Sequence, residues 1–371
     1  MKKILIGATA FALLATGITT TPATAAPVAA SSATVLDECA TLGAVAFRRG
    51  ADGSNLVCKV ATVGGMKGKR VWHYPTLPKL KNVDMIVPNS TTSGFGGFGR
   101  IIVDAMKAEG LTSKEPVVTY KLPPYNTNIR YVMVDMAGKA GKIAVTGLAQ
   151  VGGGYTTKSP WKISDGEPIA RMYAEYSGIA VKADSKYKNI KQLVADLKKD
   201  PKSMAIVGGT LGGVDTYLAA QMFKALKINI SNLNYTGSSS VQADLLSDAD
   251  YAFAISSLGD FDQFVKAGTI RLLATSAPSK IKGISAPTLK ASGVNTVVQN
   301  WRGIYLPPKT SAAGKALVLR ALDVVRASKT YKAYLSDNNA FTDWLPGAAF
   351  DTWLKRFERD LRDLYAQVGL L

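Results

Sequence analysis

Two stretches of this chain place a strand, a polar turn and a helix in the same order, and they constrain the fold more than any other feature. In the first, residues 84–109, a short apolar run predicts a buried strand, and residues 89–94 are all hydroxyl, amide or glycine. The next apolar side chains recur at helical spacing: Ile101, Ile102, Ala105 and Met106. Such a turn presents N–H groups and hydroxyls at the positive end of a helix, so it can hold an anion without a charged side chain.

The second stretch, residues 204–223, has the same design. Its strand ends at Val207 and its glycine-rich turn spans residues 208–213. Its helix has one apolar side, formed by Leu218, Ala219, Met222 and Phe223. Two anion-ready turns far apart in the chain predict two lobes that face each other across a cleft.

Strands and helices alternate over residues 84–275. This alternation predicts an α/β fold with crossover units on a parallel or mixed sheet, which binds ligands at the carboxyl ends of its strands. We expect a loop at residues 123–129 and a flexible turn at residues 152–155, because both are rich in proline, asparagine or glycine.

Two extended segments, residues 168–174 and 178–182, follow the first lobe, and the first of them is expected to lead across to the second lobe. Residues 300–307 form a further strand that is expected to lead back. Helical patterns over residues 312–328 and 348–368 then close the chain and are expected to pack on the first lobe.

Residues 1–25 are typical of a secretory signal peptide. Lys2 and Lys3 precede an apolar stretch over residues 4–18, and residues 23–25 form an A-x-A cleavage site. No later run reaches the ~18 apolar residues that a membrane span needs. We therefore expect an exported, soluble, periplasmic protein whose mature chain begins at Ala26.

Cys39 and Cys58 are the two cysteines of the chain, and a pair of cysteines in an exported protein is expected to form a disulfide. The closed loop would stabilise the fold by roughly 3 kcal/mol. Both lie in residues 26–82, a loop-rich segment appended to the first lobe. A metal site is the weaker alternative, because two thiols and the single histidine, His73, are too few for a closed zinc site. We expect neither a metal nor a cofactor.

The formal net charge of +18 comes from basic residues that are scattered along the chain. No basic helix or aromatic platform accompanies them, which argues against nucleic-acid binding. A solvated surface is one interpretation, and attraction of anionic solutes or an anionic envelope is the other. An exported hydrolase is disfavoured, because His73 lies in the appended segment and leaves no Ser–His–Asp arrangement near the hydroxyl-rich turns. We therefore do not expect an enzyme.

Five longer stretches occur in a characteristic order: VTGLAQVGGGYTTKSP (145–160), PIARMYAEYSGIAVKADS (168–185), VGGTLGGVD (207–215), KAGTIRLLATSAPSKIKGISAPTLKASGV (266–294) and NWRGIYLPP (300–308). In these stretches the chain resembles the solute-binding receptors of the tripartite tricarboxylate transporter family, which are periplasmic binding proteins of the TctC/Bug type. The resemblance implies two α/β lobes joined by two crossing strands, which close on a small organic acid like a Venus flytrap.

The order of elements and the resemblance together divide the chain into five parts, of which the signal peptide, residues 1–25, is the first. After the signal peptide, the appended segment covers residues 26–82 and lobe 1 covers residues 83–170. Lobe 2 then covers residues 171–304, and residues 305–371 return to lobe 1.

The first ligand turn of the family, P-G-G-G-W-D, aligns with residues 91–96 here. The resemblance implies that a ligand carboxylate is held there by Thr92, Ser93, Gly94 and Phe95. The family's acid is absent, because Gly96 takes its place. The next family loop, P-G-A-G-G-T, aligns with residues 123–128, where Tyr125 and Asn126 add bulk and an amide. This departure keeps open an aromatic or amide solute.

On lobe 2, the resemblance places further ligand contacts in the glycine turn and at two later helix starts: Gly209, Thr210, Gly212, Asp215, Ser238, Ser239 and Ser256. Tyr155, Tyr125 and Trp301 are aromatic residues that would line the pocket, and Arg302 is a candidate counter-charge to a carboxylate. The alternative for each hydroxyl is an ordinary helix cap, and for each aromatic a place in the core. For Asp215 the alternative is to cap or order its helix, because two carboxylates repel, and for Arg302 it is a buried ion pair or a surface position.

The resemblance implies a monomeric binding protein without turnover. It would capture a small organic acid, such as the di- or tricarboxylates of the family, and dock on the membrane permease subunits of the transporter. A ligand-sensing module for a membrane sensor would have the same cleft and stays open as the alternative.

Overall fold

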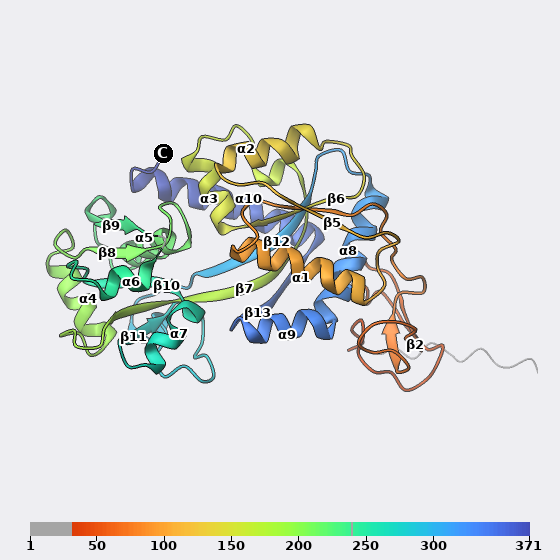
Figure 1. Cartoon of the computed structure of the whole chain (residues 1–371), viewed down its shortest axis with the longest axis horizontal. Helices are drawn as coiled ribbons and strands as arrows, with labels where there is room; N and C mark the ends of the chain where they lie inside the picture. The colour runs from red at the N-terminus through yellow and green to blue at the C-terminus, as the bar shows by residue number, and fades with distance from the viewer. Residues whose placement is uncertain (1–31, 239) are drawn as a thin grey trace, which may run out of the picture.

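The computed structural model describes residues 32–238 and 240–371. The predicted signal peptide, residues 1–25, and the predicted site residue Ser239 lie outside the described residues. The described chain forms two α/β lobes, and two long strands run from one lobe into the other (Figure 1). The predicted fold class is therefore confirmed.

Lobe 1 is built on a mixed sheet with the strand order β5-β4-β6-β12-β7, and β13 also pairs with β7. β4 is parallel to β5 and β6, whereas β12 is antiparallel to β6 and β7. The strands are β4 (Asp84–Val87), β5 (Val117–Tyr120), β6 (Lys142–Gly147), β7 (Glu167–Lys182), β12 (Gln299–Leu306) and β13 (Phe341–Pro346). β4 is buried along its whole length, as expected for an apolar strand with neighbours on both sides.

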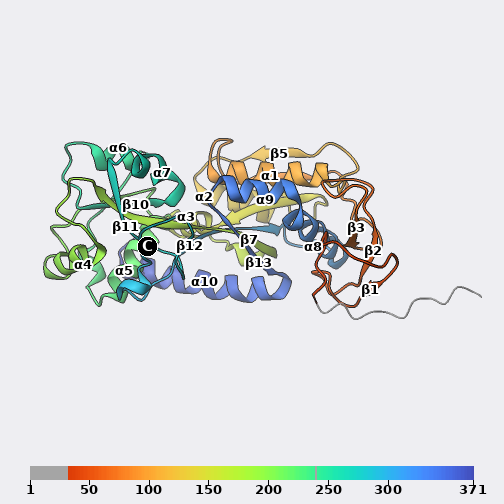
Figure 2. The same ribbon diagram turned by 90° about the horizontal axis from the view of Figure 1, so that it is seen from below.

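Helices cover both faces of this sheet, with α1 and α9 on one face and α10 on the other (Figure 2). The helices of lobe 1 are α1 (Gly94–Ala108), α2 (Tyr125–Arg130), α3 (Leu148–Thr156), α8 (Ala312–Ala327), α9 (Lys329–Asp337) and α10 (Gly347–Gln367). α1 buries Phe98, Ile102 and Met106 in the same apolar cluster as the strand residue Met85. Among the described residues, no helix has both the length and the apolar character that crossing a membrane requires.

Lobe 2 extends the sheet beyond β7 through β10, β8 and β9, and β11 also pairs with β7. Its elements are α4 (Ile190–Lys199), β8 (Ile206–Gly208), α5 (Val214–Ala225), β9 (Tyr235–Gly237), α6 (Val241–Leu246), β10 (Phe253–Ser257), α7 (Leu258–Lys266) and β11 (Ile270–Thr275). Leu218, Phe223 and Phe253 belong to an apolar cluster that is distinct from the clusters of lobe 1. Separate cores are what allow two lobes to move as units.

The two crossing strands are β7 and β12. The first part of β7 pairs with β12, from Glu167 to Tyr176, and its last residues pair with β10 and β11 in lobe 2. The predicted extended segments 168–174 and 178–182 are therefore one strand of sixteen residues. β12 returns the chain to lobe 1 at the position predicted for residues 300–307.

Two predictions of local structure are wrong. The predicted loop at residues 123–129 contains α2, which continues into a π-helical turn, and the predicted flexible turn at residues 152–155 lies inside α3. The glycines of α3 permit close contacts, because a Cβ at Gly153 would lie 2.0 Å from the Tyr125 ring. A Cβ at Gly152 would lie 2.4 Å from the Gly212 carbonyl oxygen in lobe 2. These glycines serve packing rather than chain reversal.

The appended segment forms a small antiparallel sheet at the end of lobe 1 that lies away from lobe 2 (Figure 1). Its strands are β1 (Val45–Ala46), β2 (Leu56–Val60) and β3 (Arg70–His73). The predicted disulfide joins Cys39 and Cys58. Directly after β3, the buried Tyr74 donates its hydroxyl to Asp323 Oδ2 of α8 at 2.7 Å, which ties the segment to lobe 1.

The Tyr74–Asp323 hydrogen bond predicts a stability effect. Tyr74→Phe should lower the free energy of unfolding by ~1–3 kcal/mol, because the fully buried Asp323 loses a donor and keeps only Arg326 and the longer contact from the Ala51 N–H among the described residues. Urea unfolding measures the change. Tyr120→Phe, in the half-buried edge strand β5, is the control and should shift the value by less than about 0.5 kcal/mol. Equal effects of the two changes would contradict the assigned role of Tyr74.

Candidate ligand-binding cleft

A cavity of about 1050 Å³ lies between the two lobes. Its walls come from the carboxyl ends of strands and the helix starts that follow them: β4 with α1 in lobe 1, and β8 with α5 and β10 with α7 in lobe 2. Residues of β7 and β12 line it where these strands cross between the lobes. This is the position at which α/β sheets bind ligands, and the volume accommodates a small molecule with some of its water.

The lobe 1 wall is the start of α1. Ser93 Oγ accepts the Gly96 N–H at 3.0 Å and donates to the Ser90 carbonyl at 2.7 Å, so this hydroxyl caps the helix. The N–H groups of Gly94 and Phe95 have no protein partner among the described residues, and both residues line the cavity. The wall therefore offers two backbone donors at the positive end of a fifteen-residue helix.

The glycine turn of lobe 2 uses three of its donors internally. The Gly209 N–H donates to Asp215 Oδ2 at 2.8 Å, and the Gly213 N–H donates to the Thr210 carbonyl at 2.8 Å. The Gly212 N–H donates to Thr216 Oγ1 at 3.2 Å. The carboxylate of Asp215 thus occupies the place at which this turn would otherwise hold an anion.

A buried ion pair joins the crossing strands. Arg302 Nη2 of β12 lies 2.8 Å from Glu175 Oε1 of β7, and Asn300 Nδ2 and the Tyr173 hydroxyl also donate to the Glu175 carboxylate. The Arg302 guanidinium stacks over the Tyr173 ring at 4.2 Å from its centroid. Burial acts to lower the pKa of Arg302. Glu175, Tyr173 and Tyr334 together outweigh this effect, so the pKa of Arg302 lies above its ordinary value. Arg302 is therefore charged.

The same guanidinium lies beside the lobe 1 wall. A Cβ built on Gly94 would lie 2.6 Å from Arg302 Nη2, so the glycine permits this approach. Arg302 is 7% exposed and lines the cavity. Its Nη2 is held by Glu175, and Tyr173 also lies against the guanidinium. The start of α1 and Arg302 together make one positive corner of the cleft.

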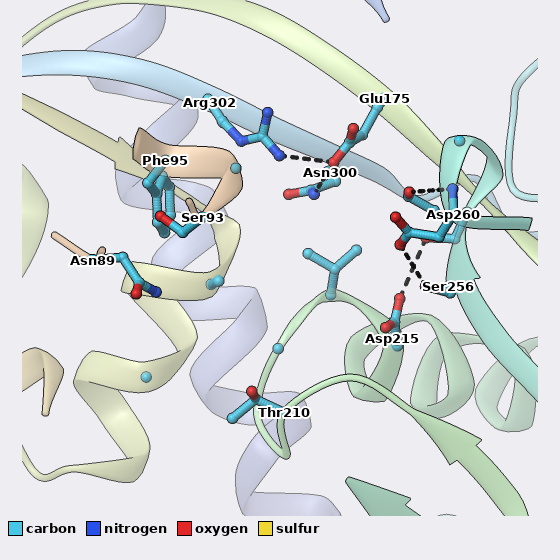
Figure 3. A pocket seen from close by; sticks show the side chains of 18 of the residues that line it. Asn89, Ser93, Phe95, Glu175, Thr210, Asp215, Ser256, Asp260, Asn300 and Arg302 are labelled. Atoms are coloured by element: carbon cyan, nitrogen blue, oxygen red, sulfur yellow. Dashed lines mark hydrogen bonds and ion pairs between the residues drawn. The ribbon is translucent and has the colours of Figure 1, made fainter. Parts of the chain in front are cut away.

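Two carboxyl groups, Asp215 and Asp260, lie next to one another on the lobe 2 side (Figure 3). Ser256 Oγ donates to Asp260 Oδ2 at 2.7 Å, and Ser177 Oγ donates to Asp215 Oδ1 at 3.5 Å. Burial raises the pKa of Asp215 to about 7; the Gly209 N–H opposes this rise, while Asp260 and Glu175 add to it. Asp215 therefore changes its charge near neutral pH.

The cavity brings together a subset of the residues named from the sequence: Ser93, Gly94, Phe95, Thr210, Gly212, Asp215 and Ser256, together with Tyr125 and Arg302. Thr92, Gly209 and Ser238 are not among its lining residues. Tyr155 lines a separate small cavity beside Glu358. Trp301 is 1% exposed and packs against α10 through Trp353.

Sequence reasoning missed Glu175, Asn300 and Asp260. A sequence signal for Glu175 was present, because Glu175 and Arg302 are charged residues in strands rich in apolar residues, and buried charges need partners. Asp260 resembles an ordinary first-turn acid of a helix, so nothing in the sequence separates it from Asp262. Among the described residues, no group of three or more His, Cys, Asp or Glu side chains could hold a metal ion.

Comparison with known families identifies the class of protein. The model of the tripartite tricarboxylate transporter family receptor matches residues 124–356, more than half of the chain. The chain belongs to this family. The family is one of substrate-binding receptors rather than enzymes. No curated protein matches the sequence.

Solved structures of this receptor class share the fold at low sequence identity. A TctC solute-binding protein from Polaromonas, solved with no ligand, is 19% identical with a TM-score of 0.64, over 79% of this chain and 99% of that one. The periplasmic binding protein BugD is 18% identical with a TM-score of 0.61, over 80% and 99%. MatC from Rhodopseudomonas palustris, solved with bound malate, is 14% identical with a TM-score of 0.60, over 80% and 99%.

The raised pKa of Asp215 predicts a pH-dependent stability. The folded state keeps the Asp215 proton up to about pH 7, whereas the unfolded chain loses it near its ordinary value of 3.8. Between these values the folded state binds more protons, so this group makes the protein less stable as the pH rises.

The variant Asp215→Asn removes the pH dependence of stability that Asp215 causes. The amide oxygen of the new side chain can still accept the Gly209 N–H. Relative to the wild type, the variant should gain stability steadily from pH 4 to pH 7, as measured by urea unfolding at several pH values. A difference between the two proteins that stays constant over this range would show that Asp215 titrates normally.

Proposed function

We propose that this protein captures a small organic acid in the interlobe cleft and delivers it to the membrane permease of a tripartite tricarboxylate transporter. Membership of the receptor family supports the proposal, and the observation that carries it is the positive corner of the cleft, formed by the start of α1 and Arg302. MatC with malate and a Rhodopseudomonas palustris protein with adipate are relatives in fold that hold carboxylates.

A ligand carboxylate is bound at this corner by the N–H groups of Gly94 and Phe95 and by the guanidinium of Arg302. Hydrogen bonds to an ionised acceptor contribute roughly 1.5–3 kcal/mol apiece. The rest of the ligand reaches Thr210, Gly212 and Ser256 on lobe 2, so that contacts on both lobes favour the closed form. Binding is reversible and involves no chemical change of the solute.

The closed receptor docks on the permease subunits in the periplasm, and opening of the lobes releases the solute. We propose that the protein acts as an exported monomer after removal of residues 1–25. The alternative partner is a membrane sensor that reads the closed form. Co-purification with the permease subunits, or with a sensor, decides between the two.

A screen of organic acids tests the binding step. On protein refolded to remove carried-over solute, isothermal calorimetry should detect at least one acid with a dissociation constant in the micromolar range or below. Small-angle scattering with that acid should give a smaller radius of gyration than the free protein. A complete screen without heat, on protein verified as ligand-free, would contradict the proposal.

A matched pair of helix-cap variants tests the place of binding. Ser93 and Ser311 cap α1 and α8 in the same way, with Oγ accepting the N–H of Gly96 at 3.0 Å and of Gly314 at 3.1 Å. Ser93→Ala and Ser311→Ala should each cost about 0.5–2 kcal/mol of stability. Only Ser93→Ala should weaken binding of the acid found in the screen, because Ser311 lies outside the lining of the cleft. Equal affinities of the two variants would place the ligand elsewhere.

A further inference from the structure

Acidic side chains outnumber basic ones in the lining of the cleft, although the protein as a whole is basic. The chain carries a formal net charge of +18, yet the cavity is lined by the carboxyl groups of Glu175, Asp215, Asp260, Asp262 and Asp337, and by Arg302 as its one cation among the described residues. A cleft would bind a di- or tricarboxylate more tightly if its cations outnumbered its acids, because like charges at close range repel.

The charges are separated in space. Glu175 is compensated by Arg302 at 2.8 Å, and Asp262 by Lys266 at 2.6 Å. Asp337 is exposed at the end of α9 in lobe 1. Asp215 and Asp260 have no basic partner within residues 32–238 and 240–371, and they lie together on the lobe 2 wall (Figure 3). The positive corner lies across the cleft on the lobe 1 side, so the ligand meets a positive wall and a negative wall.

Three N–H groups of the lobe 2 turn are also already taken within the protein. Its Gly209 N–H is taken by Asp215 Oδ2, its Gly212 N–H by Thr216, and its Gly213 N–H by the Thr210 carbonyl. At the Gly209 N–H, an incoming carboxylate would have to displace the carboxylate of Asp215. An incoming cationic nitrogen would instead find acceptors already held in place by Ser177 and Ser256.

We propose that the natural ligand is a small zwitterion, with a carboxylate at the start of α1 and Arg302 and a cationic nitrogen between Asp215 and Asp260. This inference rests on the proposed function and adds the class of solute. It assigns the two aspartates the role of selecting an amino-substituted acid over the plain acid or diacid of the same length.

Matched compounds test the selection. For two chain lengths, the probes are the diacid, the ω-amino acid and the plain monoacid: glutarate, 5-aminopentanoate and pentanoate, then adipate, 6-aminohexanoate and hexanoate. A panel of α-amino acids paired with the corresponding deaminated acids extends the test to other shapes. In calorimetry at pH 7, the aminated member of at least one pair should bind at least about tenfold more tightly than its partners.

Proton exchange gives a second readout. A cation beside Asp215 lowers the pKa of this group from about 7 and releases protons, whereas an anion there raises the pKa and takes protons up. Calorimetry of the best ligand in buffers of different ionisation enthalpy should therefore report proton release at pH 7. Proton uptake would overturn the proposal.

A pair of variants locates the effect. Asp260→Asn keeps an acceptor for Ser256 and removes the charge, and it should weaken binding of the aminated ligand by at least about tenfold without a matching loss for the plain monoacid. Asp248→Asn removes a charge from an exposed position of the same lobe outside the cleft and should leave both affinities unchanged. Melting curves establish that both variants fold.

The outcomes separate this inference from the proposed function. If plain acids or diacids bind at least as tightly as every aminated counterpart and still reduce the radius of gyration, the inference is overturned and the receptor function stands. If no acid of either class binds, both fail. Tighter binding of an aminated acid that survives Asp260→Asn also overturns the inference, because the nitrogen is then held elsewhere.

Discussion

The two strands that join the lobes carry a largely buried charge pair on the wall of the cleft. Glu175 and Arg302 lie on β7 and β12, and their contact is supported by Tyr173 and Asn300 from the same two strands. A buried charge without its partner destabilises a protein by several kcal/mol, so these strands must keep their mutual register. That register places Arg302 beside Gly94 and fixes where the positive corner of the cleft can be.

The elements that follow from local sequence were predicted well. The apolar run at the start of residues 84–109 forms β4, and Ser93 of the predicted polar turn caps α1. The polar turns before α1 and α5 also follow from the order of residue types. In these cases apolar periodicity and a capping side chain lie next to each other in the chain, so a short window contains the necessary information.

The errors arise where contacts between distant segments decide the structure. The glycines of α3 look like a turn, but they are helical because Tyr125 and the Gly212 carbonyl pack against them. α9 and β13 were not predicted, and the strand pairs with β7 some 170 residues earlier in the chain. The same limit applies to the cleft, because the sequence contains the acids of lobe 2 without showing that Asp215 turns back to the Gly209 N–H or that Asp260 lies beside it.

One contact has consequences for how the lobes can separate. The buried hydroxyl of Tyr365, near the end of α10, donates to the Gly212 carbonyl at 2.7 Å and so fastens the last helix of lobe 1 to the glycine turn of lobe 2. Gly152 of α3 approaches the same carbonyl. Opening of the lobes must therefore either break this hydrogen bond or rotate the lobes about it, and in the second case the solute passes through the opposite rim.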